Sequence, residues 1–234
     1  MQEKLSIIIP AYNEQNLISG CLDSVLNQKT DPALYEVVVI DNNSTDRTAE
    51  IAGNMGVRVV KEAQKGYVHA IRKGVEAGEG NILAFIDADC RASPTWVSKI
   101  LEDIKEAPDI VAIGGKLDFY DINPFFYQTT KLILSIVNTL PGNNMAIKRE
   151  ALERIGGIDP KVNMSLDYWL TLKLRRVGRI KIDNSLVVLT SGRRFEGAFT
   201  SHLEYFANVA SMRLLDRPIF FDFPDVREKS ILEK

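Results

Sequence analysis

Two aspartates stand one residue apart at the end of an apolar run, in the stretch NILAFIDADC. Asp87 and Asp89 flank Ala88 and follow the five apolar residues 82–86. Neighbouring carboxylates repel each other, and burial adds to the cost of ionising both. A divalent cation removes this cost, because Mg²⁺ and Mn²⁺ prefer oxygen ligands and often keep substrate phosphates in their coordination shell. The pattern therefore favours a Mn²⁺ or Mg²⁺ site with Asp89 and Asp87 as ligands.

The local structure of this stretch has alternatives. If the strand continues, Asp87 and Asp89 share one face, because side chains alternate along a strand. If the chain turns at Ala88, each carboxylate has a separate task. Asp89 could also cap a helix that begins near Ser93 and Pro94.

Polar, acid-bearing segments follow two other strand-like runs as well. PAYNE (10–14) and DNNSTD (41–46) each come directly after a run rich in β-branched residues. Ligands of parallel sheets bind beyond the carboxyl ends of the strands, so we expect these segments and the aspartate pair to form one site. Asp41 could accept a hydrogen bond from a ring N–H or a ribose hydroxyl. A simple capped turn would explain residues 44–46 but not Asp41.

The elements that must position these residues alternate along the first half of the chain. Apolar patterns predict strands at 5–9, 36–40, 57–60 and 82–86, and helices at 14–27, 46–55 and 67–78. This order predicts an α/β fold with a parallel sheet and helices on both faces. For the second half we expect a strand at 109–119, a helix at 123–140, a strand entering a short helix at 142–150, a helix at 166–178, a hairpin or successive strands at 179–183 and 186–190, and a last helix at 196–214.

Composition narrows the class of protein. The 234 residues suffice for one compact domain, and the net charge of -2 provides no field that would attract nucleic acid. Cys21 and Cys90 have neither metal-ligand spacing nor a disulfide pattern, which suits a reducing compartment. No apolar run approaches the roughly 18 residues of a membrane span, and the first residues do not form a secretory signal. We therefore expect a soluble cytoplasmic protein.

Several motifs occur together in an order that resembles family 2 of the inverting glycosyltransferases, which have the GT-A fold. They are PAYNE, D-x-x-S-T-D-x-T, G-x-x-x-A-x-x-x-G (66–74), D-x-D, GNNMAIKRE, GGIDP and LDYWLTLKLRRVG, and they cover about residues 4–178. The resemblance implies a mostly parallel central sheet flanked by helices. It also implies a Rossmann-like half that binds the nucleotide sugar (1–115), an acceptor-binding half (116–195) and a C-terminal helical extension (196–234).

The resemblance further implies roles for single residues. The nucleotide sugar would be bound by Pro10, Ala11, Tyr12, Glu14, Asp41, Asn43, Lys65, Gly66, Asp87, Ala88 and Asp89. Among them, Asp89 and Asp87 would hold the metal on the diphosphate. Asp167 would be the general base, although Leu166 replaces the first acid of the family's E-D pair. Asp167 could instead only stabilise a helix N-terminus. Asn143 and Asn144 lie in the segment that resembles the acceptor side.

Arg193 and Arg194 follow the last predicted strand, where many family members carry a histidine that reaches the metal. A guanidinium binds phosphate in a bidentate way. We therefore expect this pair to neutralise the diphosphate or an acceptor phosphate. A solvated basic turn is the alternative.

These features predict transfer of a sugar from a UDP-sugar or GDP-sugar to a glycan or lipid-linked acceptor, with inversion. Two alternatives remain: transfer to a polyprenyl phosphate, for which Asp167 would be dispensable, and a nucleotide-sugar-binding module without turnover. The helix at 123–140 and the cluster of Phe220, Phe221 and Phe223 leave peripheral contact with the inner face of a membrane open.

Overall fold

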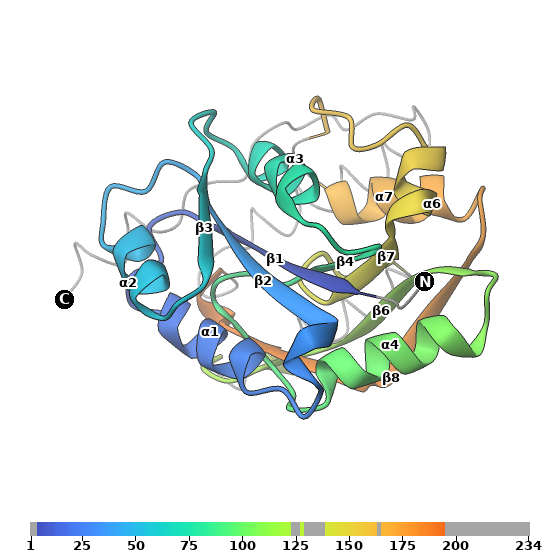
Figure 1. Ribbon diagram of the computed structural model, residues 1–234, viewed down its shortest axis with the longest axis horizontal. Coiled ribbons are helices and arrows are strands. Elements are labelled where there is room, and N and C mark those ends of the chain that lie inside the picture. The colour runs from blue at the N-terminus through green and yellow to red at the C-terminus, as the bar shows by residue number, and fades with distance from the viewer. Residues whose placement is uncertain (1–3, 123–126, 129–138, 163–164, 195–234) are drawn as a thin grey trace.

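The computed structural model describes residues 4–122, 127–128, 139–162 and 165–194, which form one sheet with helices on both faces (Figure 1). The strands are β1 (Leu5–Ala11), β2 (Tyr35–Asp41), β3 (Arg58–Lys61), β4 (Ile82–Phe85), β5 (Cys90–Ala92), β6 (Ile110–Phe119), β7 (Met145–Lys148) and β8 (Arg179–Thr190). The helices are α1 (Ile18–Leu26), α2 (Thr48–Asn54), α3 (Tyr67–Ala77), α4 (Trp96–Glu106), α6 (Arg149–Arg154) and α7 (Leu166–Leu174), with short 3₁₀ turns η1 (Pro32–Leu34) and η2 (Gly192–Arg194).

The strand order is β3-β2-β1-β4-β7-β6-β8-β5. The first four strands are parallel, and β7 is antiparallel to both β4 and β6. β8 then runs parallel to β6, and β5 antiparallel to β8. The α/β class predicted from the sequence is confirmed. The carboxyl ends of β1, β2 and β4 meet at one edge, which is where the acid-bearing segments emerge.

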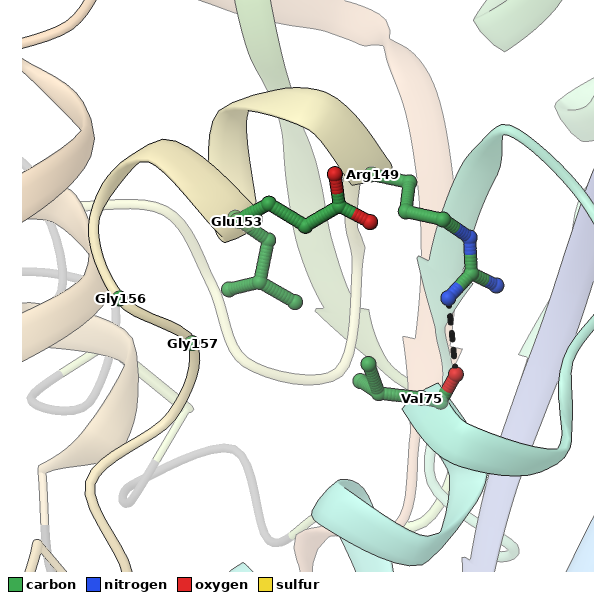
Figure 2. A pocket seen from close by; sticks show the side chains of 6 residues that line it. Val75, Arg149, Glu153, Gly156 and Gly157 are labelled. Atoms are coloured by element: carbon green, nitrogen blue, oxygen red, sulfur yellow. Dashed lines mark hydrogen bonds between the residues drawn. The ribbon is translucent and has the colours of Figure 1, made fainter.

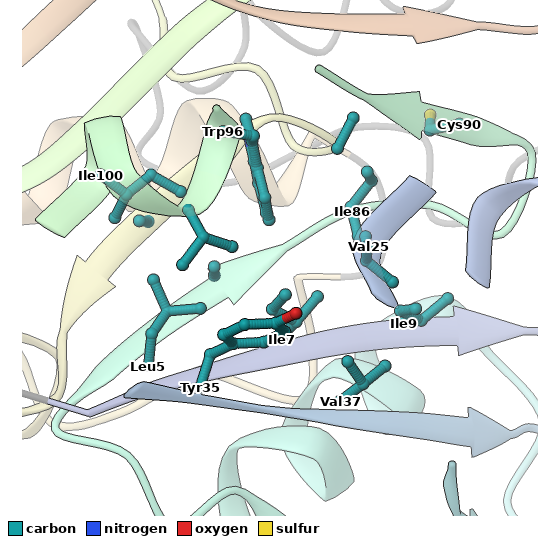
Figure 3. Packing of buried hydrophobic residues seen from close by; sticks show 14 of the residues in the cluster. Leu5, Ile7, Ile9, Val25, Tyr35, Val37, Ile86, Cys90, Trp96 and Ile100 are labelled. Atoms are coloured by element: carbon teal, nitrogen blue, oxygen red, sulfur yellow. The ribbon is translucent and has the colours of Figure 1, made fainter. Parts of the chain in front are cut away.

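Strand β1 contributes to both layers of the core because its side chains alternate. Leu5, Ile7 and Ile9 pack with residues of α1 and α4, such as Trp96, whereas Ile8 packs on the opposite face with α3, α6 and α7 (Figures 1 and 3). All of these side chains are fully buried. A strand covered on both faces explains the unbroken apolar run in this part of the sequence.

Two element predictions need correction. Residues 179–190 form one strand, not a hairpin, because β8 pairs with β6 on both sides of a register shift at Gly115/Lys116. Helix α1 begins at Ile18 instead of residue 14, since the Glu14 carbonyl accepts from the N–H groups of both Leu17 and Ile18 in a turn. The predicted helix at 196–214 and most of the one at 123–140 lie outside the described residues.

Arg149 holds the end of α3 at the amino edge of the sheet. Its guanidinium donates to the carbonyls of Gly80, Val75 and Gly78 at 2.9, 3.0 and 2.6 Å. Figure 2 shows the bond to Val75. These bonds satisfy carbonyls at the helix end that lack helical partners. A groove of about 410 Å³ beside Arg149 is lined by none of the predicted site residues. It lies at the edge opposite Asp87, so we assign it no part in the chemistry.

Candidate functional site

The loops after β1 and β2 are tied together side by side. Ala11 pairs with Asp41 in the sheet, so both loops leave the same edge. The Asn13 N–H donates to Ser44 Oγ at 3.1 Å, and its Oδ1 accepts from the Thr45 N–H at 2.8 Å. The Glu14 N–H donates to Thr48 Oγ1 at 2.7 Å, which connects the first loop to the start of α2. PAYNE and DNNSTD therefore form one continuous surface.

Asp41 is separate from the capping residues, as the functional interpretation requires. Asp46 caps α2 by accepting the Thr48 N–H at 2.9 Å. Asp41 is 4% exposed, and its Oδ1 accepts the Ser44 N–H at 3.2 Å. Across the same loops, Lys65 Nζ lies 3.0 Å from the Tyr12 hydroxyl and 4.5 Å from its ring centroid. The residues predicted for the nucleotide thus meet at one place.

The chain turns at Ala88, so the two aspartates point to different neighbours. The Cys90 N–H donates to the Asp87 carbonyl at 3.0 Å, and β5 begins directly at Cys90. Asp87 Oδ1 accepts from the Tyr67 hydroxyl at 3.3 Å. Helix α4 begins only at Trp96 and has no side-chain cap, so the alternative that Asp89 caps this helix is wrong.

Arg193 lies against the second aspartate of the pair. Its Nη2 donates to Asp89 Oδ2 at 3.0 Å and to Glu14 Oε1 at 2.5 Å. The Arg193 side chain is 29% exposed, and those of the two acids are each 4% exposed. A partly buried cation between two buried carboxylates reduces their mutual repulsion. The predicted partner, Arg194, ends the described residues, and its side chain lies outside them.

The segment that carries Arg193 is held by a residue that the sequence analysis missed. Asp121 accepts from the Ser191 hydroxyl at 2.7 Å and from the Gly192 N–H. The Ser191 N–H also donates to the Asp89 carbonyl at 3.2 Å. These bonds hold the segment that carries the guanidinium against Asp89. No local pattern around Asp121 indicates this role, because its partners lie 70 and 71 residues away.

Replacing Arg193 by alanine is expected to weaken binding of a nucleoside diphosphate at least tenfold, since a charged hydrogen bond contributes about 1.5–3 kcal/mol. It should also destabilise the fold by about 2 kcal/mol, because two buried carboxylates lose their cation. Calorimetric titration and urea unfolding measure the two effects. The control is Arg179→Ala, which breaks the exposed pair with Asp109 (2.8 Å) and should change neither quantity appreciably. Equal effects of the two variants would contradict the assignment.

The two cysteines near the aspartates remain thiols. Burial, followed by the negative charges of Asp89 and Asp87, raises the pKa of both Cys21 and Cys90. A thiolate is the form that binds metals and attacks electrophiles. Both side chains are buried and pack beside the site.

The acids fit a metal that shares its coordination with a ligand. Among the residues that the structure describes, no group of three or more His, Cys, Asp and Glu side chains could hold a metal ion. Mg²⁺ is usually bound through one or two carboxylates together with water and substrate phosphates. Asp89 and Asp87 are two such carboxylates, but Asp89 also pairs with Arg193, so their role as metal ligands remains a prediction.

Asp167 lies in the first turn of α7. Its Oδ1 accepts the Tyr168 N–H at 2.9 Å, and its Cβ lies 3.5 Å from the point where a Cβ on Gly142 would stand. The Tyr67 hydroxyl, which binds Asp87, lies 3.9 Å from the same point. Asp167 and the Tyr67 hydroxyl therefore both lie near Gly142, and Tyr67 connects this point to Asp87.

The neighbouring amides Asn143 and Asn144 have different roles. Asn143 Nδ2 points to Cys90 Sγ (3.4 Å) and Thr190 Oγ1 (3.5 Å), beside the aspartate pair. Asn144 is fully buried, donating to the carbonyls of Lys116 and Leu186 and accepting from Trp96 Nε1, each at 2.8–2.9 Å. Because its amide is fully buried and bonded within the core, we replace its predicted acceptor role with a structural one.

The Asn144→Ala variant is expected to lose about 3 kcal/mol of stability, because it leaves an indole N–H and two carbonyls buried without partners. Urea unfolding measures this loss. Asn143→Ala provides the matched control and should cost less than about 1 kcal/mol. A stability loss of Asn144→Ala as small as that of the control would refute the structural role.

Residues with unfavourable backbone conformations also occur at the site. The non-glycine residues with positive φ among those described are Asn13, Asn43 and Ser165, at 53°, 64° and 60°. Asn13 and Asn43 lie in the loops after β1 and β2, and Ser165 directly precedes α7. Such conformations are costly and cluster at functional sites. Their positions agree with the site built from the side chains.

No helix in the described part of the chain combines the length and apolar character needed to cross a membrane.

Comparison with known proteins adds independent evidence. Residues 6–158 match the model of the family described as glycosyl transferase family 2. The glycosyltransferase AglE of Haloferax volcanii is 30% identical over 169 residues, which cover 65% of this chain and 55% of AglE. The chain thus spans little more than half of that relative.

Solved structures agree on the fold. The mannosyltransferase PcManGT of Pyrobaculum calidifontis, in complex with GDP-Man and Mn²⁺, superimposes with a TM-score of 0.70 at 21% identity, covering 91% of this chain and 65% of the other. The glucosyl-3-phosphoglycerate synthase of Mycobacterium tuberculosis, with Mn²⁺, UDP-Glc and phosphoglyceric acid, gives 0.68 at 22% identity, covering 89% and 79%. The predicted GT-A fold is confirmed.

Proposed function

Because this chain belongs to glycosyltransferase family 2, we propose that it transfers a sugar from a nucleotide-diphosphate sugar to an acceptor hydroxyl with inversion, aided by Mg²⁺ or Mn²⁺. The observation that carries this proposal is the convergence at one sheet edge. Asp87, Asp89 and Arg193 lie there with the buried Asp41, and Asp167 lies beside Gly142, near the Tyr67 hydroxyl that binds Asp87. Acids for a metal, a cation for phosphate and a carboxylate base are the groups that this reaction needs.

The donor occupies the first half of the chain, 1–115, in this proposal. Asp41 binds the base or ribose, supported by its burial at the end of β2. Tyr12 and Lys65, which contact each other, flank the nucleotide, and Gly66 and Asn43 complete its surroundings. The ligands bound in the two structural relatives, GDP-Man and UDP-Glc, support a donor of this class.

Two sources provide positive charge that neutralises the diphosphate. A divalent metal, held by Asp89 and Asp87, supplies Lewis acidity for the leaving diphosphate when it is bound. Arg193 adds a cation from the chain itself, already placed against Asp89 and Glu14. Fixed positive charge stabilises the negative charge that develops on the leaving group. The Mn²⁺ ions of the structural relatives support the choice of metal.

Asp167 performs the proton transfer in the second half, 116–195. The acceptor oxygen attacks the anomeric carbon, and the bond from that carbon to the phosphate oxygen breaks with its electron pair leaving on the diphosphate. The acceptor proton passes to the Asp167 carboxylate. Attack from the face opposite the diphosphate inverts the configuration. The position of Asp167 beside Gly142, near the Tyr67 hydroxyl that binds Asp87, supports this role.

The acceptor is a glycan or a lipid-linked compound in this proposal. The predicted membrane contacts, the helix at 123–140 and the cluster of Phe220, Phe221 and Phe223, lie mostly or wholly outside the described residues and stay predictions. The same holds for the C-terminal extension at 196–234 and for cytoplasmic localisation at the inner membrane face.

A thermal-shift screen with UDP-glucose, GDP-mannose and dTDP-glucose, with and without Mn²⁺, tests the donor proposal. One nucleotide sugar at about 100 times its Kd should stabilise the fold by about 2.7 kcal/mol, which raises Tm by roughly 5–10 °C. The shift should require Mn²⁺. Nucleoside monophosphates serve as the control, because they lack the diphosphate. No shift with any of these sugars in the presence of Mn²⁺ would count against the proposal.

A further inference from the structure

Tyr67 is a site residue that the sequence analysis did not identify, and its position is closely fixed. It is the first residue of α3, directly after Gly66, whose φ of 135° favours glycine. The Gly66 N–H donates to Asn42 Oδ1 at 2.8 Å, and Asn42 Nδ2 donates to the carbonyls of Glu62 and Gln64. The tyrosine ring packs against the core on the α3 face. The hydroxyl is therefore held at one place.

That hydroxyl lies where donor and acceptor must meet. It donates to Asp87 Oδ1 at 3.3 Å. Both it and the Cβ of Asp167 lie within 4 Å of the position that a side chain on Gly142 would occupy. Because residue 142 is a glycine, no side chain of its own fills this space.

We propose that Tyr67 positions the sugar ring that is transferred, in the space in front of Gly142. This inference rests on the proposed function. Direct displacement requires the anomeric carbon to lie between the leaving diphosphate and the base. The point next to Gly142 lies within 4 Å of the Asp167 Cβ and of the Tyr67 hydroxyl, which is bonded to Asp87. A phenol hydroxyl both donates and accepts, so Tyr67 can bind Asp87 and a sugar hydroxyl at once.

The inference predicts a selective loss of affinity for the sugar. In Tyr67→Phe the ring and its packing remain, and one hydroxyl is lost. Calorimetric titration with Mn²⁺ should show 5- to 10-fold weaker binding of UDP-glucose, GDP-mannose or dTDP-glucose, whichever binds the wild type, corresponding to one hydrogen bond. The matching nucleoside diphosphate should bind within twofold of wild type. Tyr35→Phe is the matched control, because its hydroxyl donates to the Leu26 carbonyl at the same 3.3 Å.

A second variant probes the space directly. A methyl group in Gly142→Ala would make only ordinary contacts, at 3.5 Å or more, so the fold should be retained. It should weaken nucleotide-sugar binding more than tenfold and leave the nucleoside diphosphate unaffected. Gly53→Ala, where an added Cβ would meet nothing within 4 Å, is the control.

The outcomes separate the two proposals. If the wild type binds one of the three nucleotide sugars, but Tyr67→Phe and Gly142→Ala bind it as the wild type does, the inference about Tyr67 is overturned alone. A parallel loss of nucleotide-sugar and nucleoside-diphosphate affinity would overturn it too. If the wild type binds none of these nucleotide sugars, the proposed function fails, and the inference fails with it.

Discussion

The Asp167→Asn variant is expected to transfer sugar about a thousandfold more slowly than the wild-type enzyme, because an amide cannot take the proton of the acceptor hydroxyl. Donor binding should be unchanged, since Asp167 lies beside Gly142 and its Oδ1 bonds the Tyr168 N–H, which an asparagine oxygen also accepts. Single-turnover rates and calorimetric titration of the donor measure the two quantities separately.

The control for this variant addresses the alternative that Asp167 only stabilises the N-terminus of α7. Glu150 stands in the first turn of α6, as Asp167 does in α7, and contributes the same kind of helix-dipole interaction. Glu150→Gln should leave the transfer rate unchanged. If Asp167→Asn slows transfer no more than Glu150→Gln, the base assignment is wrong. Full activity of the Asp167→Asn variant with a polyprenyl phosphate would favour that acceptor, because a phosphate is already ionised and needs no base.

The Asp89→Asn variant is expected to lose Mn²⁺-dependent binding of the donor and to lower kcat/KM at least 100-fold. An amide oxygen carries no charge, so it binds the metal poorly, and it also leaves Arg193 without one of its two carboxylate partners. Mn²⁺ titration followed by electron paramagnetic resonance, in the presence of UDP or GDP, measures metal binding independently of turnover.

Asp109→Asn provides the matched control for Asp89→Asn. Asp109 pairs with Arg179 through two hydrogen bonds of 2.8 and 3.1 Å, in an exposed position outside the site. Its replacement removes the same charge and should not change Mn²⁺ affinity. Unaltered Mn²⁺ binding by Asp89→Asn would show that the ion lies elsewhere and would remove the main support for the metal-dependent mechanism.

Arg193 adds a positive charge to a site whose other charged side chains are mainly carboxylates. The sequence offered two interpretations of this residue, a phosphate-binding cation and a solvated basic turn. Its contacts with Glu14 and Asp89, and the hydrogen bonds of Asp121 to its segment, argue against a solvated turn, and phosphate binding by Arg193 remains a proposal. The site therefore carries one resident cation, and a metal would share Asp89 with it.

Features that depend on a local sequence pattern were predictable. The unbroken apolar run at 82–86 predicted a buried strand, and the acids at the end of β2 and directly after β4 predicted a site at one sheet edge. This works because parallel strands joined by helices must bring their carboxyl ends to the same edge. The family motifs extended the prediction to Asp167, whose position near Gly142 and Tyr67 the local pattern does not reveal.

Contacts between side chains that are distant in the sequence follow only from the folded structure. Arg193 reaches an aspartate 104 residues earlier in the chain, and Asn144 lies in the core while the adjacent Asn143 faces the aspartate pair. Tyr67 meets Asp87 only because α3 begins at a point fixed by Asn42. Such contacts depend on strand register and on where each loop ends. Those are set by packing across the whole sheet, and no short stretch of sequence contains that information.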